Sequence, residues 1–294
     1  MGLSVSWLYQ QIIARYVLAR FGTPAQRRRY LRAAAAGKIT LSFAVSEPGH
    51  GAHPRLMTTY AQKHARHFVL NGEKTYLTNS PIADIFIVVA VTDDTQLQKR
   101  FTAFIVGRKA SGVTVTEPLA MNFLKPSPHG GIKLDNCIIE KKSVLGNEGS
   151  AWPDIAVPLG EIEDVVMMGP VLVSMEAQLT MLIDAIRKNP PPQDRALQEE
   201  LGALHALLTT LRLIAYEAAG RLDRNNAAPI PLGITFARLA AEFSAGIAPL
   251  PGKWKISLPA EYNYLQRDME FLVSLKKRLL QIRQGKIGAA LLKT

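Results

Sequence analysis

The sequence predicts an α+β chain in three parts. These are a short N-terminal helical segment over residues 1–38, a middle β-barrel or sandwich domain over residues 39–152, and a C-terminal four-helix bundle over residues 153–294. The hydrophobic pattern has helical spacing up to about Gly37, alternates with period two from Ile39, and returns to helical spacing after Trp152. With 294 residues, 48% of them hydrophobic and 20% charged, the chain has globular composition and can bury a sizeable core.

The first segment reads as two helices. Apolar side chains from Trp7 to Phe21 follow helical spacing, and Gly22 ends that run. Thr23 then begins a second helix, with proline at its first position and Gln26 three residues after the cap, which is the pattern of a capping box.

The middle part reads as short strands separated by turns. A strand over residues 41–45 is followed by a loop over residues 46–51, and residues 67–70 and 75–77 are expected to form a hairpin around Asn71-Gly72. The run 84–91 is almost entirely apolar, so it predicts a strand buried on both faces. Three more strands are expected at 102–106, 113–116 and 132–134, and this spacing favours a closed or sandwiched β-domain.

The last part reads as a helical bundle. A long helix is expected over residues 162–187, interrupted at Pro170, and the prolines that follow Asn189 end it. Asp194 is expected to cap a second helix that runs to about residue 222, with further helices over 234–247 and 264–283.

Charge and cysteine content narrow the class of protein. The net charge of +11, with a pI near 9.8, would suit nucleic acid, an anionic membrane surface or a phosphate-rich cofactor. The basic residues are dispersed and not interleaved with aromatics, so we expect no nucleic-acid partner. No apolar run approaches bilayer length, so we expect no membrane span. Cys137 is the only cysteine, which predicts a cytoplasmic chain without internal disulfides, and the histidine pairs lack further ligands, so we expect no metal.

Several ordered motifs carry a family resemblance. Residues 46–53 read Ser-Glu-Pro-Gly-His-Gly-Ala-His, and residues 70–79 read Leu-Asn-Gly-Glu-Lys-Thr-Tyr-Leu-Thr-Asn. Residues 21–31 upstream and 144–152 downstream add matches at the right spacing. Together with the helix, β-domain, helix order, these segments resemble the acyl-CoA dehydrogenase family over about half of the chain.

The resemblance implies a flavin-dependent oxidation of a CH–CH bond. In that chemistry a carboxylate removes the α-proton of an acyl-CoA thioester, while the β-hydrogen passes as hydride to FAD. The resemblance also implies a role in fatty acid metabolism, an acyl-CoA substrate, and a homo-oligomer or a pairing with a full-length relative. It places these residues against the isoalloxazine ring, with main-chain donors and a hydroxyl at its edge: Phe43, Val45, Ser46, Tyr76 and Thr78.

The chain departs from the family pattern at several places. It begins partway through the N-terminal helical domain of the family, and Ala52 and His53 replace a serine and an aspartate. Residues 189–194 stand where the family has an Arg-x-x-Phe-Gly segment, and residues 249–253 stand where it has a Gly-Gly-x-Gly loop. Both of those family segments contact flavin across a subunit boundary, so both contacts are expected to be missing here.

The catalytic base is the sharpest departure. The usual Tyr-Glu-Gly-Thr stretch before the last helix is absent, and residues 275–277 read Leu-Lys-Lys. A minority of relatives place the base in the first bundle helix, in a Leu-x-x-Glu-Arg pattern, which puts it at Glu163 and puts Asp164 in place of the arginine. The competing interpretation is an ordinary acidic residue at a helix start. Two hypotheses follow: an acyl-CoA dehydrogenase, or a non-catalytic member that acts as a binding or partner-interaction protein.

Overall fold

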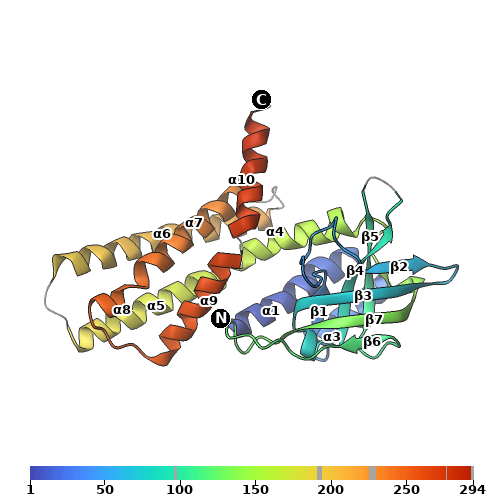
Figure 1. The fold of residues 1–294 in the computed structure, drawn as a ribbon, viewed down its shortest axis with the longest axis horizontal. Helices are drawn as coiled ribbons and strands as arrows, with labels where there is room; N and C mark the ends of the chain where they lie inside the picture. Colours follow the sequence, from blue (N-terminus) through green and yellow to red (C-terminus); the bar gives the residue numbers. More distant parts are fainter. Residues whose placement is uncertain (96–97, 191–193, 225–229, 276, 293–294) are drawn as a thin grey trace. The chain divides into compact units, whose positions relative to one another are not determined.

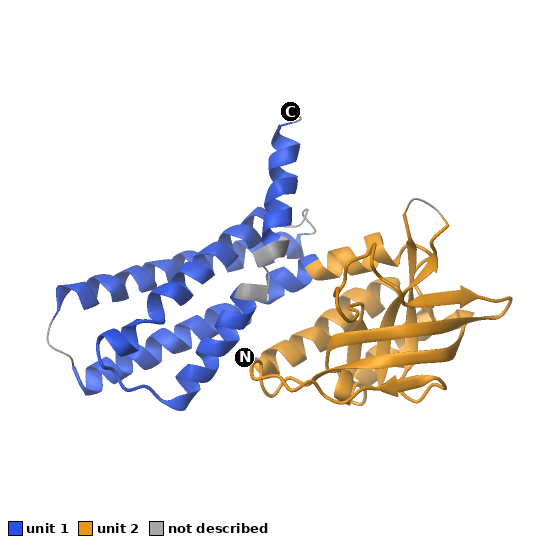
Figure 2. Cartoon of the chain, viewed as in Figure 1, with its two compact units in different colours: residues 1, 161–294 blue, residues 2–160 orange. Residues whose placement is uncertain are grey.

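The computed structural model describes residues 1–95, 98–190, 194–224, 230–275 and 277–292. These residues form two compact units, residues 2–160 and residues 161–294 with Met1 (Figure 2). The helices at the N-terminus and the β-strands belong to the same unit. The predicted divisions at residues 38 and 152 stay a prediction, and each unit is described by itself below.

The N-terminal helices are α1 (Gly2–Ile12), a π-helical turn (Ile13–Leu18), α2 (Ala19–Phe21) and α3 (Pro24–Ala35). The predicted capping box at the start of α3 is confirmed, because the Gln26 amide donates to Thr23 Oγ1 over 3.2 Å and the Thr23 amide donates to Gln26 Oε1 over 2.8 Å. The side chain of Gln10 joins α1 to the sheet by accepting from the Leu41 amide and donating to the Ile39 carbonyl.

The strands form one mixed eight-stranded sheet in the order β6-β7-β3-β2-β4-β5-β8, with β1 paired to β4 (Figure 1). Strand β4 runs parallel to β1 and antiparallel to β5. The prediction that β4 is buried on both faces is confirmed, since Phe86 and Ile87, on opposite faces, are both fully buried. The strands are β1 (Leu41–Ala44), β2 (Tyr60–Lys63), β3 (His67–Thr78), β4 (Ile85–Asp93), β5 (Arg100–Gly107), β6 (Val113–Val115), β7 (His129–Glu140) and β8 (Val144–Leu145). Short 3-10 turns cover Ser80–Ile82 and Lys141–Ser143.

The predicted hairpin around Asn71-Gly72 is wrong. Both residues lie inside β3, which pairs along its length with β7 and shifts register between Leu70 and Gly72. The turn that precedes β3 lies instead between His64 and His67, where the His64 amide donates to the His67 carbonyl over 2.9 Å. Gly72 has a φ of +142° and passes close to Thr59, so the glycine serves a bulge and a close approach of two strands.

The second unit contains the predicted bundle, formed by α5 (Met168–Lys188), α6 (Arg195–Asp223), α7 (Ile230–Ile247) and α9 (Ala260–Leu275). A π-helical turn (Trp152–Ala156) and α4 (Val157–Val166) precede α5, and the helix breaks at Met167 because Pro170 has no N–H for the Val166 carbonyl. The predicted cap is confirmed: Asp194 accepts from the Ala196 amide over 2.8 Å. The expected helix 264–283 corresponds to two helices, α9 and α10 (Lys277–Leu291), and residue 276 between them lies outside the described residues. Residues 191–193, in the prolines that were expected to end the first bundle helix, also lie outside the described residues. A short helix, α8 (Leu250–Lys253), precedes α9.

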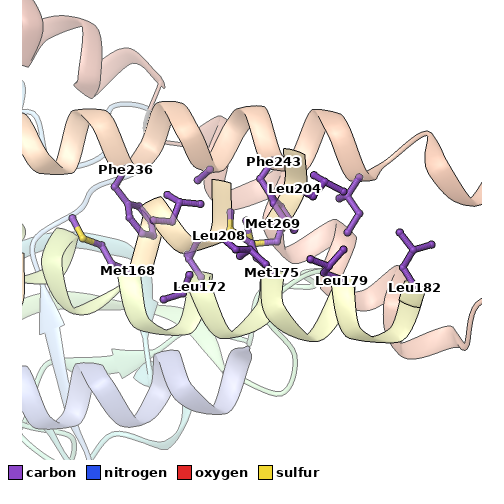
Figure 3. Close-up of a cluster of buried hydrophobic side chains, with 14 of the residues drawn as sticks. Met168, Leu172, Met175, Leu179, Leu182, Leu204, Leu208, Phe236, Phe243 and Met269 are labelled. Atoms are coloured by element: carbon purple, nitrogen blue, oxygen red, sulfur yellow. The ribbon is translucent and has the colours of Figure 1, made fainter. Parts of the chain in front are cut away.

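The core of the bundle is built mainly from leucine, methionine and phenylalanine side chains of α5, α6 and α7 (Figure 3). Two helical stretches, Trp152–Lys188 and Ile230–Lys253, have the length and apolar composition of a bilayer span. Both stretches supply side chains to this core, which accounts for their apolar character. The absence of a membrane span therefore stays a prediction.

Candidate functional site

A buried ion pair joins the two sequence motifs. Glu47, in the turn after β1, and Lys74, in β3, are 1% and 0% exposed, and Lys74 Nζ lies 3.0 Å from Glu47 Oε1. Lys74 also donates to the Val45 carbonyl over 3.0 Å. The Glu47 carboxylate accepts further hydrogen bonds from the amides of Thr58 at 2.7 Å and Thr59 at 2.9 Å. The turn is thereby fixed against the middle of β3.

The charges of this pair are set by burial and by these partners. Burial alone would raise the pKa of Glu47, but the Lys74 ammonium and the hydrogen bonds from Thr59 and Thr58 outweigh it and hold this pKa at about 2. Burial lowers the pKa of Lys74 to about 8, although the Glu47 carboxylate opposes that change. Both groups are charged at neutral pH, so the pair is a structural joint and leaves Glu47 no proton to transfer.

Beside this joint the chain presents Ser46 and Tyr76. The Thr75 amide donates to the Ser46 carbonyl over 2.9 Å, which places the turn against β3. Tyr76 has a φ of +56° where the register of β3 shifts, and its side chain is 66% exposed. A tyrosine with positive φ is unusual, and here it accompanies a bulge that leaves the ring in solvent. Phe43 is buried. Among the described strands β1 has the single partner β4, which leaves its other edge without a strand.

Thr78 lies at the end of β3, directly opposite His129 of β7. Thr78 Oγ1 is 3.2 Å from His129 Nε2, and His129 Nδ1 is 3.1 Å from the Ser127 carbonyl oxygen. The Ser42 hydroxyl, from β1, donates to the Thr78 carbonyl over 2.8 Å. The Ser127 hydroxyl oxygen is buried without a hydrogen-bond partner among the described residues. This end of β3 therefore gathers hydroxyl and imidazole groups in a small volume.

Glu163 lies in the helical unit, on α4. It lines a cavity of about 100 Å³ together with Asp164 and Arg283, whose side chains form an ion pair. Within the described part of the chain, the Glu163 carboxylate has no ion-pair or hydrogen-bond partner. The rest of the lining is mainly apolar and includes Met167, Met168, Val171, Phe236, Met269 and Leu272. A carboxylate at an apolar cavity can act as a base, because little else competes for its lone pairs.

The structure joins the turn that carries Val45 and Ser46, two of the residues predicted to contact a flavin ring, to the strand β3 that carries Tyr76 and Thr78. Val45 and Ser46 are bonded to β3 through Lys74 and Thr75, and Ser42 is bonded to Thr78. Glu163 belongs to the unit of residues 161–294 and lines a cavity formed within that unit. Whether each of these residues has its predicted role stays a prediction.

Sequence reasoning missed four residues of these sites. Glu47 and Lys74 were visible as letters of the motifs, but nothing in the sequence marks Lys74 as buried, since Lys63 and Lys133 also lie in strands and are exposed. His129 lies in no recognised motif, and Arg283 lies far along the chain from its partner Asp164. No sequence signal could have found these two.

The other histidines do not gather as metal ligands. His64 and His67 stack with ring centroids 4.7 Å apart beside the turn before β3, and His50 Nε2 lies 3.2 Å from Glu47 Oε2. Across the described ranges, no three His, Cys, Asp or Glu side chains form a cluster that could hold a metal ion.

Comparisons with known proteins identify the class. Residues 42–137 match the family model described as the acyl-CoA dehydrogenase middle domain. The 3-(aryl)acrylate reductase of Clostridium sporogenes is 30% identical over 206 residues, which cover 69% of this chain. The mitochondrial 2-methylacyl-CoA dehydrogenase of Solanum tuberosum is 29% identical over 251 residues, or 84% of this chain. A glutaryl-CoA dehydrogenase from Mycobacterium smegmatis in complex with FADH2 has the same fold, with a TM-score of 0.82 and 23% identity over 97% of this chain and 74% of its own.

The family-model match and the sequence relatives, together with the motifs, show that the chain belongs to the acyl-CoA dehydrogenase family, and the solved structure shows the shared fold. The chain spans 55% of the length of the Clostridium relative and 60% of the length of the Solanum relative.

Proposed function

We propose that the chain is an FAD-dependent dehydrogenase that forms an α,β double bond in an acyl-CoA thioester. The observation that carries the proposal is the buried ion pair between Glu47 and Lys74, which fixes the turn that contains Ser46 against β3, the strand that carries Tyr76 and Thr78. Family membership supports the reaction class, and a relative of the same fold was solved with FADH2.

The residues present fit an isoalloxazine ring. Tyr76 offers an exposed aromatic face, and flat aromatic systems stack on such faces. The open edge of β1 and the Thr78 hydroxyl can hydrogen-bond the polar edge of the ring, and the Ser127 hydroxyl is a buried polar atom in need of a partner. When bound, FAD supplies the acceptor for the hydride that leaves the β-carbon of the substrate. The part of this chain is to hold and orient the ring.

Glu163 is the proposed base for the α-proton. The ion pair with Arg283 already engages Asp164, so of the two neighbouring carboxylates we assign this role to Glu163. The lining of its cavity is mainly apolar, which suits an acyl chain.

We also infer an oligomeric, cytoplasmic protein of fatty acid metabolism, without a membrane span or a nucleic-acid partner. Exposed apolar side chains on α5 and α6, namely Val173, Leu213 and Tyr216, support association with a second copy or a full-length relative. The single cysteine, Cys137, is buried and burial raises its pKa to about 11, which supports a structural role in a reducing compartment.

Absorption spectroscopy of the purified full chain tests the proposal. The chain is saturated with FAD and then mixed with butyryl-CoA in the absence of oxygen. We expect flavin bands that shift on binding and bleach with substrate. Glu163→Gln is expected to bind FAD but not to bleach, whereas the matched control Glu242→Gln, an exposed acidic residue on α7, is expected to behave as the native chain. Equal bleaching by Glu163→Gln would remove that residue as the base.

The alternative is a non-catalytic binding or partner-interaction protein, and one departure from the family pattern bears on it. The helix α8 (Leu250–Lys253) and its flanks stand where the resemblance implies a glycine-rich flavin contact. The spectra decide between the hypotheses, because a chain that takes up no FAD even in excess is not a dehydrogenase of this type.

A further inference from the structure

His129 lies outside every motif that identified the family. His129 is 8% exposed and stands opposite Thr78 in the antiparallel pair of β3 and β7. Its main chain is fixed on both sides: the Leu119 amide donates to the His129 carbonyl over 2.8 Å, and the Asn79 amide donates to the Pro128 carbonyl over 2.8 Å. The main chain that carries the imidazole is therefore fixed opposite Thr78, and the ring itself lies against Thr78 Oγ1 and the Ser127 carbonyl oxygen.

The hydrogen bonds of the imidazole assign its proton. The Ser127 carbonyl can only accept, so His129 Nδ1, at 3.1 Å, must carry the hydrogen. Burial lowers the pKa of His129, and the hydrogen bond to Ser127 only partly opposes this, so the ring is neutral at neutral pH. A neutral imidazole has one N–H, which leaves Nε2 as an acceptor.

The same reasoning assigns the proton of the Thr78 hydroxyl. Because Nε2 lies 3.2 Å from Oγ1 and can only accept, Thr78 must be the donor. A hydroxyl has one hydrogen, and here that hydrogen is committed to His129. The lone pairs of Oγ1 remain, so toward any ligand Thr78 acts as an acceptor.

We infer that His129 is a positioning residue that, together with the Ser127 carbonyl, holds the Thr78 hydroxyl as a hydrogen-bond acceptor for an N–H group of the isoalloxazine ring. The inference rests on the proposed function for its ligand, but the hydrogen-bond chain itself is a property of the protein alone. Oxidised and reduced flavins differ in the N–H groups that they carry, so a fixed acceptor binds the two redox states with different strength. A fixed acceptor also favours the ring placement that brings an N–H group to it.

The first test needs no cofactor. Nitrogen-15 NMR of labelled histidine in the full chain without FAD reports which ring nitrogen is protonated. We expect a neutral ring protonated on Nδ1, and Thr78→Val is expected to move the Nε2 signal and leave Nδ1 protonated. A ring protonated on Nε2, or on both nitrogens at neutral pH, would overturn the inference.

The second test uses FAD itself and two matched variants. His129→Leu removes the acceptor, whereas His129→Gln places an amide oxygen near the position of Nε2. We expect His129→Leu to change one of two quantities by about fivefold, which is the effect of one hydrogen bond. The first is the dissociation constant of oxidised FAD. The second is the ratio of the dissociation constants of oxidised FAD and FADH2, which is read from the midpoint potential. His129→Gln is expected to recover most of the change.

The outcomes separate this inference from the proposed function. No change in either quantity for His129→Leu, or a change that His129→Gln fails to recover, would overturn the positioning role. Failure of the native chain to bind FAD would overturn the proposed function and the flavin part of this inference, and the NMR result would still decide whether the hydrogen-bond chain exists. Thermal unfolding of both variants, compared with the native chain, identifies a variant that has lost its fold.

Discussion

Lys74 Nζ lies 3.0 Å from Glu47 Oε1, and both side chains are fully enclosed by the β-domain. The pair connects the turn after β1 to the middle of β3, which are the two segments that carry the strongest family motifs. Charges taken out of water are costly unless they are paired and hydrogen-bonded, and here the Val45 carbonyl and the Thr58 and Thr59 amides supply those bonds. The structural role of Glu47 and Lys74 in the two motifs is therefore to connect the turn after β1 to β3.

Breaking this pair from one side is expected to be strongly destabilising. Lys74→Met leaves the Glu47 carboxylate buried without its counter-charge, and we expect the free energy of unfolding to fall by roughly 3–5 kcal/mol. Urea denaturation followed by hydrogen exchange in β3 measures the change in this unit. The matched control is Lys63→Met, which breaks the exposed pair with Glu148 and should cost less than about 1 kcal/mol. Equal losses in the two variants would contradict the account of the buried joint.

Low pH is expected to remove the stabilisation that the Glu47–Lys74 ion pair provides. The pKa of Glu47 falls from its ordinary value of 4.5 to about 2 on folding, so between these values the unfolded chain binds more protons than the folded chain. The contribution of Glu47 is fully present above pH 4.5 and is lost as pH falls toward 2; a shift of this size corresponds to roughly 3 kcal/mol. Urea midpoints measured across this range should decline more steeply for the native chain than for Glu47→Gln. Parallel declines would show that other groups dominate the acid response.

The bundle core is expected to respond to loss of single side chains. Leu182, on α5, is fully buried (Figure 3), so Leu182→Ala removes apolar contacts and leaves a cavity. We expect a loss of roughly 2–5 kcal/mol, measured by hydrogen exchange in α5 during urea unfolding. The control is Gln198→Ala, at an exposed position of α6, which should change stability by less than about 0.5 kcal/mol. A small effect at Leu182 would mean that the bundle is loosely packed.

The helices could be predicted from the sequence because their signals are local. The capping box at Thr23, the cap at Asp194 and the break near Pro170 each depend on residues within one or two turns, and the structure has all three. The short apolar runs bounded by turn residues likewise located β1, β4 and β5. The site was less predictable, because the contacts of His129 with Thr78 and of Arg283 with Asp164 join segments far apart in the chain.

The error at Asn71-Gly72 has the same cause. This dipeptide is a strong local signal for a hairpin turn. In the structure, the pairing of β3 with β7 overrides that signal, and the strand continues through both residues. The partner strand β7 supplies Asn136, whose amide donates to the Asn71 side chain over 2.8 Å and whose φ of +49° matches a bulge. Only the position of that second strand distinguishes a bulge from a turn.

The bulge predicts a strict requirement for glycine at position 72. A Cβ added there would lie 2.5 Å from Thr59 Oγ1 and 2.7 Å from Thr59 Cα, and the φ of +142° is unfavourable for any other residue. Gly72→Ala should therefore lower the stability of the β-domain by more than about 2 kcal/mol, as measured by hydrogen exchange in β2 and β3. Thr59→Ala in the same chain should not restore it, since the clash with the Cα atom remains. Gly160→Ala, in α4 with open space around it, is the control and should be neutral or stabilising by up to about 1 kcal/mol. If Gly72→Ala changed stability no more than Gly160→Ala does, Thr59, just before β2, could not lie as close to Gly72 as it does in the structure.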